Sequence, residues 1–304
     1  MSQQTTNRVV FEVPLLKELN KQYTVVDMHF HTRYSDGVNT PREIARKLRK
    51  LGIGIAVTDH NTIAGALEMA HYKDVLSIPG IEITSREGAH ILVYFYEAGA
   101  LQHFYKTEVM PFLGKELMSS IALTMEEIIW RARKYDSALI LFAHPYCAMY
   151  TGVCNSIFTR DRQRQLLELA DGVEVINAGN LKKWNLKSTV LGFNLNKAMT
   201  GGSDGHSLYQ LGKSVSYADT PGDRVAFLDA VRAGENAVMG KETAFIRKVA
   251  GNGVNLKSSL KNTPDLMEKN VRYSYALINR TSRHVKAHMQ RRLQERRLRK
   301  NGSY

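Results

Sequence analysis

Residues 25–37 read VVDMHFHTRYSDG, and this stretch holds the strongest clue to the fold. Its first half is a largely apolar run, which is typical of a buried strand. His29 and His31 are two positions apart, so their side chains lie on the same face of that strand. Imidazole and carboxylate groups suit Zn, Mn, Fe or Co as ligands. The stretch therefore predicts a strand that carries metal ligands at its carboxyl end.

The same combination of an apolar strand and a terminal ligand recurs further along the chain. The strings are IAVTDHN (55–61), IPGIEIT (78–84), LILFAHPY (139–146) and TGGSDGH (200–206). The side chains suited to metal binding in or beside these strings are His29, His31, Asp36, His60, Glu82, His90, His144, Asp204 and His206. Six of the ten histidines in the chain belong to this set. A cluster this rich indicates several metal ions and hydrolysis rather than a structural role.

Predicted helices separate these strands. Segment 40–52 carries helix signals at both ends, with Thr40 and Glu43 as an N-terminal capping box and Gly52 as the C-terminal stop. A second capping box begins a helix predicted over residues 124–135. Repeated strand-then-helix units predict a parallel sheet, and about seven of them predict closure into a barrel. The active site of such a fold lies at the carboxyl ends of the strands, where the predicted ligands fall.

Some residues near these strings are open to a structural interpretation. His90 stands before the apolar run ILVYFY rather than after a strand. Asp36 precedes a glycine and could be a turn residue. Asp59 could orient the His60 imidazole or simply cap the next helix. Cys147 follows His144 closely, but we interpret it as a small buried thiol rather than a ligand.

Together, the strings resemble the polymerase and histidinol phosphatase (PHP) domain, a superfamily of metal-dependent phosphoesterases. The resemblance spans residues from about Thr24 to Met239 and includes the H-x-H with SDG, the TDH, the strand-end histidine and the terminal D-x-H. It implies an α/β fold, a distorted (β/α)7 barrel of the PHP type, with two or three divalent ions such as Mn, Zn or Fe. The implied ligand sets are His29, His31, Glu82 and Asp204 for the first ion, Glu82, His90 and His144 for the second, and Asp36, His60 and His206 for the third.

The segments HTRYSDG and GIEITSREGAH look most like the small stand-alone branch of this family, which acts on nucleotides and RNA 5′ ends. Arg33 matches an arginine that this branch places near the substrate phosphate. We therefore expect Arg33 and Asn177 to bind phosphate, and Asp59 or a metal-bound water to supply a proton to the leaving group. The expected reaction is attack on phosphorus by a hydroxide that bridges two ions, either as a phosphomonoesterase or as an exonuclease at nucleic-acid 5′ or 3′ phosphates.

Three alternatives are weighed against this interpretation. A histidinol-phosphate-type phosphatase would share the fold, but its motif context is less similar. A nucleic-acid-binding protein could keep the PHP fold as a scaffold, whereas the complete ligand set favours an enzyme. An amidohydrolase would use a similar barrel and H-x-H, but it usually needs a metal-bridging lysine, and no strand-end lysine stands in a suitable position.

Charge and composition indicate how the chain is organised. The net charge is +13, and the segment from Arg272 onward holds ten Lys and Arg against one acid, Glu295. We predict an N-terminal extension (1–23), a PHP barrel (24–250) and a basic C-terminal extension (251–304), helical or partly disordered, that could bind RNA or DNA. The two cysteines make no disulfide framework, and we find neither a signal pattern nor a transmembrane run, so we expect a cytoplasmic protein.

Overall fold

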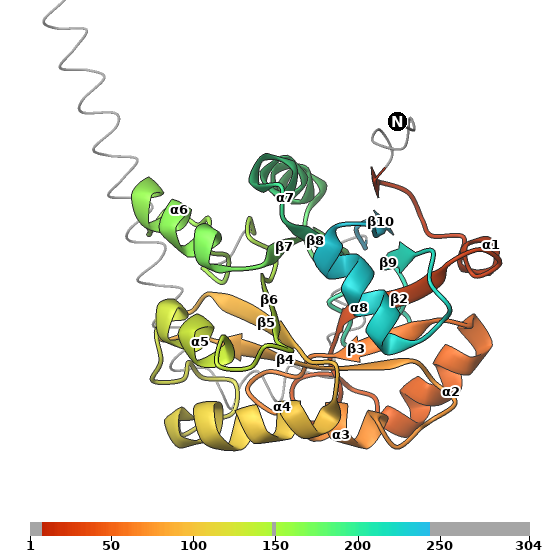
Figure 1. The fold of residues 1–304 in the computed structure, drawn as a ribbon, viewed down its shortest axis with the longest axis horizontal. Helices are drawn as coiled ribbons and strands as arrows, with labels where there is room; N and C mark the ends of the chain where they lie inside the picture. The colour runs from red at the N-terminus through yellow and green to blue at the C-terminus, as the bar shows by residue number, and fades with distance from the viewer. Residues whose placement is uncertain (1–7, 148–149, 244–304) are drawn as a thin grey trace, which may run out of the picture. The chain divides into compact units, whose positions relative to one another are not determined.

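The computed structural model describes residues 8–147 and 150–243, which form a mixed α/β fold (Figure 1). Within these residues, ten strands form one sheet in the order β1-β10-β9-β2-β3-β4-β5-β6-β7-β8. The strands are β1 (Val9–Val10), β2 (Thr24–Phe30), β3 (Gly54–Val57), β4 (Ser77–Thr84), β5 (His90–Tyr94), β6 (Leu139–Phe142), β7 (Gly172–Asn177), β8 (Ala198–Gly202), β9 (Ser214–Ala218) and β10 (Ala237–Gly240).

Helices connect most of these strands, and two short turns of helix follow α4. The helical elements are α1 (Leu16–Leu19), α2 (Pro41–Leu51), α3 (Ala64–Met69), α4 (Ala98–Phe104), η1 (Tyr105–Val109), η2 (Met110–Phe112), α5 (Met125–Ala132), α6 (Arg160–Leu169), α7 (Lys182–Leu195) and α8 (Arg224–Ala233). The capping box predicted for α2 is confirmed, because the Glu43 amide donates to Thr40 Oγ1 at 3.2 Å. Its predicted stop is also confirmed, since Gly52 has a φ of 72°.

Helix α5 ends earlier than its sequence pattern predicts. Both halves of its capping box form, but the helix stops at Ala132 rather than at Tyr135. The amide of Tyr135 donates to the Ala132 carbonyl oxygen at 3.0 Å, a contact across three residues instead of four. The chain tightens into a turn there, because it must reverse direction to enter β6.

The expectation of an all-parallel sheet is wrong at four strand pairs. Strand β5 runs antiparallel to β4 and β6, and β9 runs antiparallel to β2 and β10. Only residues 85–89 connect β4 to β5, and a connection this short permits an antiparallel hairpin but no parallel crossover. His90 therefore begins β5 beside the carboxyl end of β4, where it pairs with Thr84.

The seven strands from β2 to β8 curl into the predicted distorted barrel. After β8 the chain returns to β2, where the Asp204 amide donates to the His29 carbonyl oxygen at 2.8 Å and the His31 amide donates to Gly205 at 2.9 Å. A side chain at Gly202 would collide with the Cβ of His29, so glycine permits this approach. The ends of the strands that carry the predicted ligands thus meet at one rim.

A β-bulge in β2 decides which way His29 points. Asp27 pairs with Ile55 and Phe30 pairs with Val57, so three residue steps on β2 face two on β3. Met28 packs with residues of the inner face, while Phe30 packs with the outer helices. The extra residue turns His29 to the inner side as well, which a regular strand would not do.

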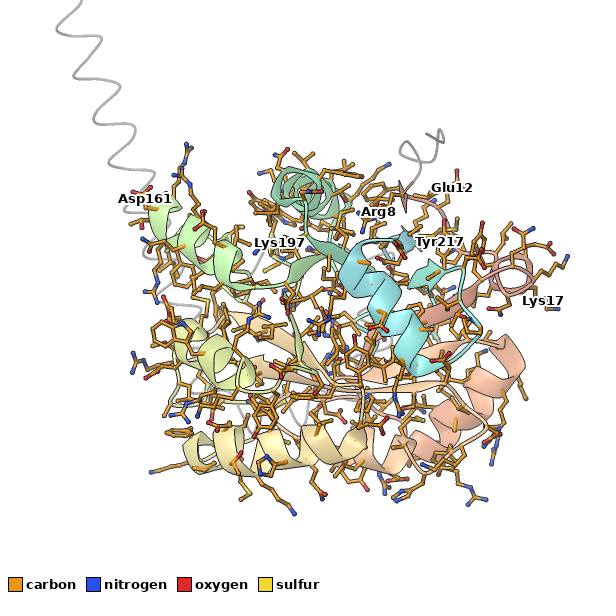
Figure 2. The ribbon with its side chains drawn as sticks, in the orientation of Figure 1. Arg8, Glu12, Lys17, Asp161, Lys197 and Tyr217 are labelled. Atoms are coloured by element: carbon orange, nitrogen blue, oxygen red, sulfur yellow. The ribbon has the colours of Figure 1, made fainter. Side chains whose placement is uncertain are left out.

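Lys197, directly before β8, joins the start of that strand to the carboxyl end of α6, at the end of the strands remote from this rim. The ammonium of Lys197, labelled in Figure 2, donates to the carbonyl oxygens of Leu167 at 3.0 Å, Glu168 at 2.6 Å and Ala170 at 2.5 Å. These are carbonyl groups at the carboxyl end of α6, which otherwise lack partners within the helix. Lys197 therefore has a structural role.

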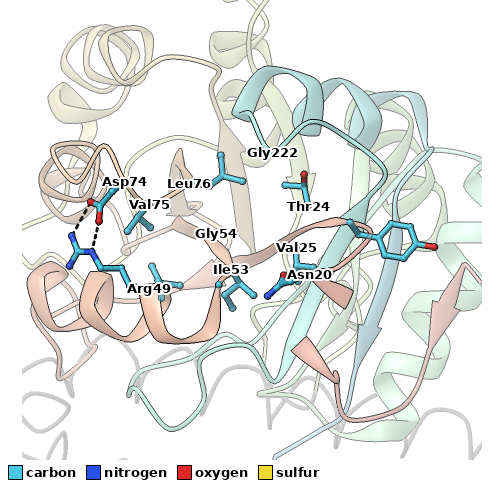
Figure 3. Close-up of a pocket in the computed structure, with 13 residues that line it drawn as sticks. Asn20, Thr24, Val25, Arg49, Ile53, Gly54, Asp74, Val75, Leu76 and Gly222 are labelled. Carbon is cyan, nitrogen blue, oxygen red and sulfur yellow. Dashed lines mark hydrogen bonds and ion pairs between the residues drawn. The ribbon is translucent and has the colours of Figure 1, made fainter. Parts of the chain in front are cut away.

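A hollow of about 390 Å³ lies at the amino ends of β2 and β3 (Figure 3). Thr24 and Val25 begin β2 at its wall, and Gly54 begins β3. Arg49 and Asp74 form an ion pair at its edge, with Arg49 Nε 2.5 Å from Asp74 Oδ2. The hollow is thus at the opposite ends of the strands from the predicted ligands.

The two predicted extensions differ in what the structure describes. Residues 8–23 contribute β1, which pairs with β10 through Val9 and Val238, and the short helix α1. The predicted basic extension (251–304) lies outside the described residues. None of the helices in the described ranges has the length and apolar character needed to cross a membrane.

Candidate metal centre

The predicted ligands gather at the rim formed by β2, β3, β4, β6 and β8 and by the start of β5. Glu82, on β4, lies at the centre of the group and is buried. Its Oε1 is 2.9 Å from His90 Nδ1 and 3.4 Å from His144 Nε2. Its Oε2 is 2.9 Å from His60 Nδ1 and 3.4 Å from His29 Nε2. One carboxylate therefore faces four imidazoles that come from four different parts of the chain.

A first group of nitrogen and oxygen atoms forms around the end of β2. The Nε2 atoms of His29 and His31 are 3.1 Å apart, and Asp204 Oδ1 lies 3.1 Å from His31 Nε2. Glu82 Oε2 completes the group at 3.5 Å from His31 Nε2. These are the four residues that the resemblance assigns to a first ion.

A second group forms around Asp36, in the loop after β2. Asp36 Oδ2 lies 2.8 Å from His206 Nε2 and 3.8 Å from His60 Nε2. Asp36 Oδ1 is 3.6 Å from the Nδ1 atom of His31. His31 and His60 thus each direct one ring nitrogen toward Asp36 and the other toward Glu82 or its neighbours.

Two of these residues are in backbone conformations that L-amino acids rarely adopt. His144 has a φ of 26° and Asp204 has a φ of 47°. Positive φ values in residues other than glycine cost free energy and persist where surrounding contacts enforce them. Each residue stands two positions after the last residue of a strand, so the strain accompanies the turn that points its side chain into the rim.

The electrostatic environment favours ionised carboxylates surrounded by cations. Although burial by itself raises the pKa of Glu82, the imidazoles of His90, His60 and His29 bring it well below its usual range. Burial lowers the pKa of His206, but the nearby Asp36 and Asp204 carboxylates raise it to about 9. A divalent cation would be stabilised by the same carboxylates that stabilise a protonated imidazole.

The positions of several nitrogen and oxygen atoms in the cluster suit coordination of a metal ion better than hydrogen bonding to one another. His31 Nδ1 is buried and has no hydrogen-bond partner among the described residues, and Glu82 Oε2, although 2.9 Å from His60 Nδ1, lies outside hydrogen-bonding geometry. The Nε2 atoms of His29 and His31 face each other at 3.1 Å, where at most one of them can donate. Buried polar atoms without partners are costly, and a shared cation would satisfy them. The donor set therefore fits divalent metal ions.

Glu174 completes the site, and the sequence interpretation missed it. Its Oε1 lies 3.0 Å from His29 Nδ1, while its Oε2 accepts the His144 amide at 2.8 Å. This contact directs the proton of His29 to Nδ1 and leaves Nε2 free for a metal. A signal was available, because Glu174 is a lone carboxylate in the apolar run GVEVI, as Glu82 is in PGIEI.

Asp27 is a second buried carboxylate that the sequence interpretation passed over. It accepts hydrogen bonds from the Ser203 hydroxyl at 2.6 Å, the Ser203 amide at 2.8 Å and the Gly212 amide at 2.9 Å. Ser203 directly precedes Asp204, so these contacts hold the Asp204 turn against β2. Burial raises the pKa of Asp27 to about 6.

The structure places Asp59 behind the loop that follows β2. Its Oδ1 accepts the Thr32 amide at 2.7 Å and the Ser35 hydroxyl at 2.6 Å, and its Oδ2 accepts the Thr32 hydroxyl at 2.7 Å. Burial raises the pKa of this carboxyl group. These contacts connect the end of β3 to the loop that carries Arg33 and Asp36.

The two residues predicted to bind phosphate have different surroundings. Arg33 is exposed between the ligands His31 and Asp36, with its guanidinium 5.7 Å from the Tyr34 ring centre. Asn177 is buried, and its Nδ2 donates to Glu174 at 2.9 Å and to Asp204 at 3.2 Å. Its contacts support a role in positioning Asp204, and phosphate binding by Asn177 stays a prediction.

Family comparisons match most of the described chain. Residues 27–170 match the PHP domain, and residues 183–236 match the PHP-associated domain. The uncharacterized protein MJ1587 of Methanocaldococcus jannaschii is 29% identical over 167 residues, which cover 50% of this chain and 81% of that protein. The matched PHP region begins at β2 and ends just after α6, so it contains seven of the nine predicted ligands.

Solved structures of similar fold extend this comparison. A two-domain protein of Bacteroides vulgatus that contains a predicted PHP-like metal-dependent phosphoesterase aligns with a TM-score of 0.54 and 18% identity, over 78% of this chain and 70% of that one. The lesion-specific endonuclease PfuEndoQ of Pyrococcus furiosus aligns with a TM-score of 0.55 and 17% identity, over 71% of this chain and 57% of that one. At identities this low, the structural alignments show a shared fold alone.

Proposed function

The chain carries a PHP domain of the metal-dependent phosphoesterase family, and from this premise we propose that it hydrolyses phosphate esters of nucleotides or nucleic-acid ends. The observation that carries the proposal is the arrangement around Glu82, whose two oxygens each face a separate pair of imidazoles. A carboxylate so placed can hold two cations close together. PfuEndoQ, which shares the fold, is an endonuclease, and this supports a nucleic-acid substrate.

The proposed chemistry divides between bound ions and the residues of the chain. Divalent ions would supply an activated water near neutral pH and offset the charge of the phosphate. Glu174 fixes the His29 tautomer, so that Nε2 faces the cluster. Asp27 holds the turn before Asp204 against β2 and thereby sets the position of that carboxylate. The chain thus preorganises the ligands before any substrate arrives.

Arg33 is the residue best placed to bind the phosphate. Its side chain is exposed, while its amide donates to the Asn39 carbonyl oxygen at 3.0 Å and so fixes the backbone. A guanidinium can form paired hydrogen bonds with phosphate oxygens. We expect Arg33→Ala to weaken substrate binding more than metal binding, and Arg42→Ala, an exposed arginine on α2, to serve as the matched control. Unchanged kinetic constants with every phosphate substrate would return Arg33 to the role of a solvated loop residue.

We assign Asp59 a positioning role rather than that of a proton donor. Both of its oxygens accept hydrogen bonds from Thr32 or Ser35, so the carboxyl group is held by the loop after β2. The loop in turn presents Asp36 to the cluster. This role predicts that Asp59→Asn alters metal affinity as well as turnover.

The decisive test is a substrate panel measured with added Mn²⁺ or Zn²⁺. The panel contains phosphomonoesters, nucleoside bisphosphates, histidinol phosphate and short RNAs, each tested with wild-type protein and with Asp204→Asn. Hydrolysis that EDTA abolishes and that Asp204→Asn lacks would support the proposal. If wild-type protein loaded with either metal hydrolyses none of these compounds, the proposal fails.

The basic extension provides a test of the alternative in which the chain mainly binds nucleic acid. Cations that contact phosphates release counterions, so the affinity they supply falls steeply with salt. We expect deletion after Tyr275 to weaken oligonucleotide binding and flatten its salt dependence, while mononucleotide turnover changes little. Equal oligonucleotide affinity with and without the extension at low salt would exclude this role.

A further inference from the structure

A hollow of about 410 Å³ lies between α7 and the loop after β6. Its lining residues are Tyr146, Leu186, Lys187, Val190, Leu191 and Asn194. Tyr146 follows the predicted ligand His144 by two positions. Asn180 Nδ2 donates to the Tyr146 carbonyl oxygen at 2.6 Å, and the Asn180 amide donates to Asn177 at 3.0 Å. Short contacts therefore connect the hollow to residues of the metal site.

The walls of the hollow combine apolar surface, an aromatic ring and a cation. Leu186 is 45% exposed and Val190 is 60% exposed, although both are large apolar side chains. The Lys187 ammonium lies 5.8 Å from the Tyr146 ring centre. The volume of the hollow is within the range of about 300–1,000 Å³ that is usual for small-molecule sites. This combination suits a flat, partly apolar group that is attached to an anion.

The charge around the hollow points to the same class of ligand. Lys187 and Lys183 lie 4.7 Å and 4.9 Å from the Trp184 ring centre, so the half-buried indole supports both ammonium groups. Lys182 begins the same helix. The sequence contains no acidic residue from Val175 to Ser203. Cations beside an aromatic ring, without acidic neighbours along the helix, are typical of surfaces that bind single-stranded nucleic acid.

We propose that this hollow binds a nucleobase of the substrate strand, and that Lys183 and Lys187 bind the adjacent backbone phosphate. The inference rests on the proposed function, because it extends a strand whose terminal phosphate occupies the metal centre. It makes an oligonucleotide, rather than a mononucleotide, the preferred substrate. The base packs against Tyr146 and the exposed faces of Leu186 and Val190, which explains why these side chains are uncovered.

The test compares a 5′-phosphorylated trinucleotide with its abasic counterpart, which has the same phosphates and no bases. Binding is measured by rapid mixing with the full, Zn²⁺-loaded chain, before turnover accumulates. Trp130 and Trp184 are the two tryptophans of the chain, and Trp130 is 60% exposed, so a Trp130→Phe background reports Trp184 fluorescence alone. A basic extension that binds phosphates affects both oligomers equally and cannot produce a difference between them.

We expect the trinucleotide to bind about tenfold more tightly than the abasic oligomer and to change the Trp184 fluorescence. Tyr146→Ala should remove this difference in affinity, whereas Tyr146→Phe keeps the ring and should preserve it. Lys187→Ala should lower the salt slope by about one, and Lys50→Ala, an exposed lysine on α2, should not.

Equal affinity of wild-type protein for the two oligomers would overturn the inference, as would an unchanged difference in Tyr146→Ala. The inference would also be overturned if Val190→Asp converted a dimer to a monomer in sedimentation experiments, because a second copy would then cover the hollow. Base-dependent binding without any hydrolysis would refute the proposed function and leave the binding site standing. Hydrolysis without base-dependent binding would overturn the inference and leave the proposed function standing.

Discussion

The two ends of strands β2, β3 and β4 carry groups of very different chemistry. At the amino ends, the hollow of about 390 Å³ has polar groups that are already paired (Figure 3). Thr24 Oγ1 donates to the Thr220 carbonyl oxygen at 2.9 Å, and Asn20 Nδ2 donates to Leu51 at 2.9 Å. At the carboxyl ends, His31 Nδ1 is buried without a hydrogen-bond partner among the described residues, and both oxygens of Glu82 face imidazole nitrogens.

This contrast shows that the clustering of imidazoles and carboxylates, rather than the size of a hollow, marks the candidate site. A paired polar group gains nothing further from a ligand, whereas a buried atom without a partner does. The same strands thus end in a structural surface on one side and the candidate metal centre on the other, and barrel enzymes generally place their active sites at the carboxyl ends of the strands. Substitutions at the two ends should therefore have very different effects.

The largest effect is expected from Asp204→Asn. The neutral amide removes a charge that faces His29 and His31, so we expect kcat/KM for a phosphoester to fall by about a thousandfold. Asp74→Asn, at the amino-end hollow, makes the same chemical change and should leave kcat/KM unaltered. Steady-state kinetics and thermal unfolding of both variants provide the measurement. Activity of Asp204→Asn within about tenfold of wild type would remove the distinction between the two ends.

Glu82→Gln should lower the metal content by more than one ion per chain. The reason is that Oε1 faces His90 and His144 while Oε2 faces His60 and His29, so one substitution disturbs two groups of ligands. Elemental analysis of purified protein measures the stoichiometry.

The matched control for Glu82→Gln is Glu108→Gln. Glu108 is also buried, but it pairs with Arg131 at 2.7 Å and with Lys134 at 3.0 Å. Its substitution should leave the metal content unchanged. An identical metal content in both variants would argue against a bridging role for Glu82.

A smaller effect is expected from Glu174→Gln. Removing the carboxylate that orients a metal-binding histidine typically lowers metal affinity or activity by about 10–100-fold. Glutamine keeps the size of the side chain and one carbonyl oxygen, so the fold should be retained. Competition with a chelator measures the affinity. An affinity equal to that of wild type would show that the contact with His29 does not control the site.

The smallest effect is expected at the amino-end ion pair. Arg49 and Asp74 are both exposed to solvent, and pairs of this kind contribute little to stability. We therefore expect Arg49→Ala to leave both turnover and metal content unaltered and to shift the thermal midpoint very little. A large loss of activity in this variant would mean that the amino-end hollow takes part in function.

The sequence alone determined the elements that local chemistry controls. A ligand at the end of an apolar strand is recognisable because side-chain alternation and strand ends depend on neighbouring residues only. The strings around His29, His60, Glu82, His144 and Asp204 therefore predicted a single rim, and the barrel that forms this rim is observed. The capping box of α2 was equally readable, since all of its partners lie within one helical turn.

How distant segments meet depends on the packing of the whole chain. The position of His90 follows from the antiparallel direction of β5, and the direction of His29 follows from a bulge measured against β3. The contact of Glu174 with His29 joins residues 145 positions apart, and Tyr146 faces α7 across a gap that no local pattern reveals. Strand direction, register and such contacts depend on the packing of the whole chain, because the free energy that selects them is shared among segments far apart in sequence.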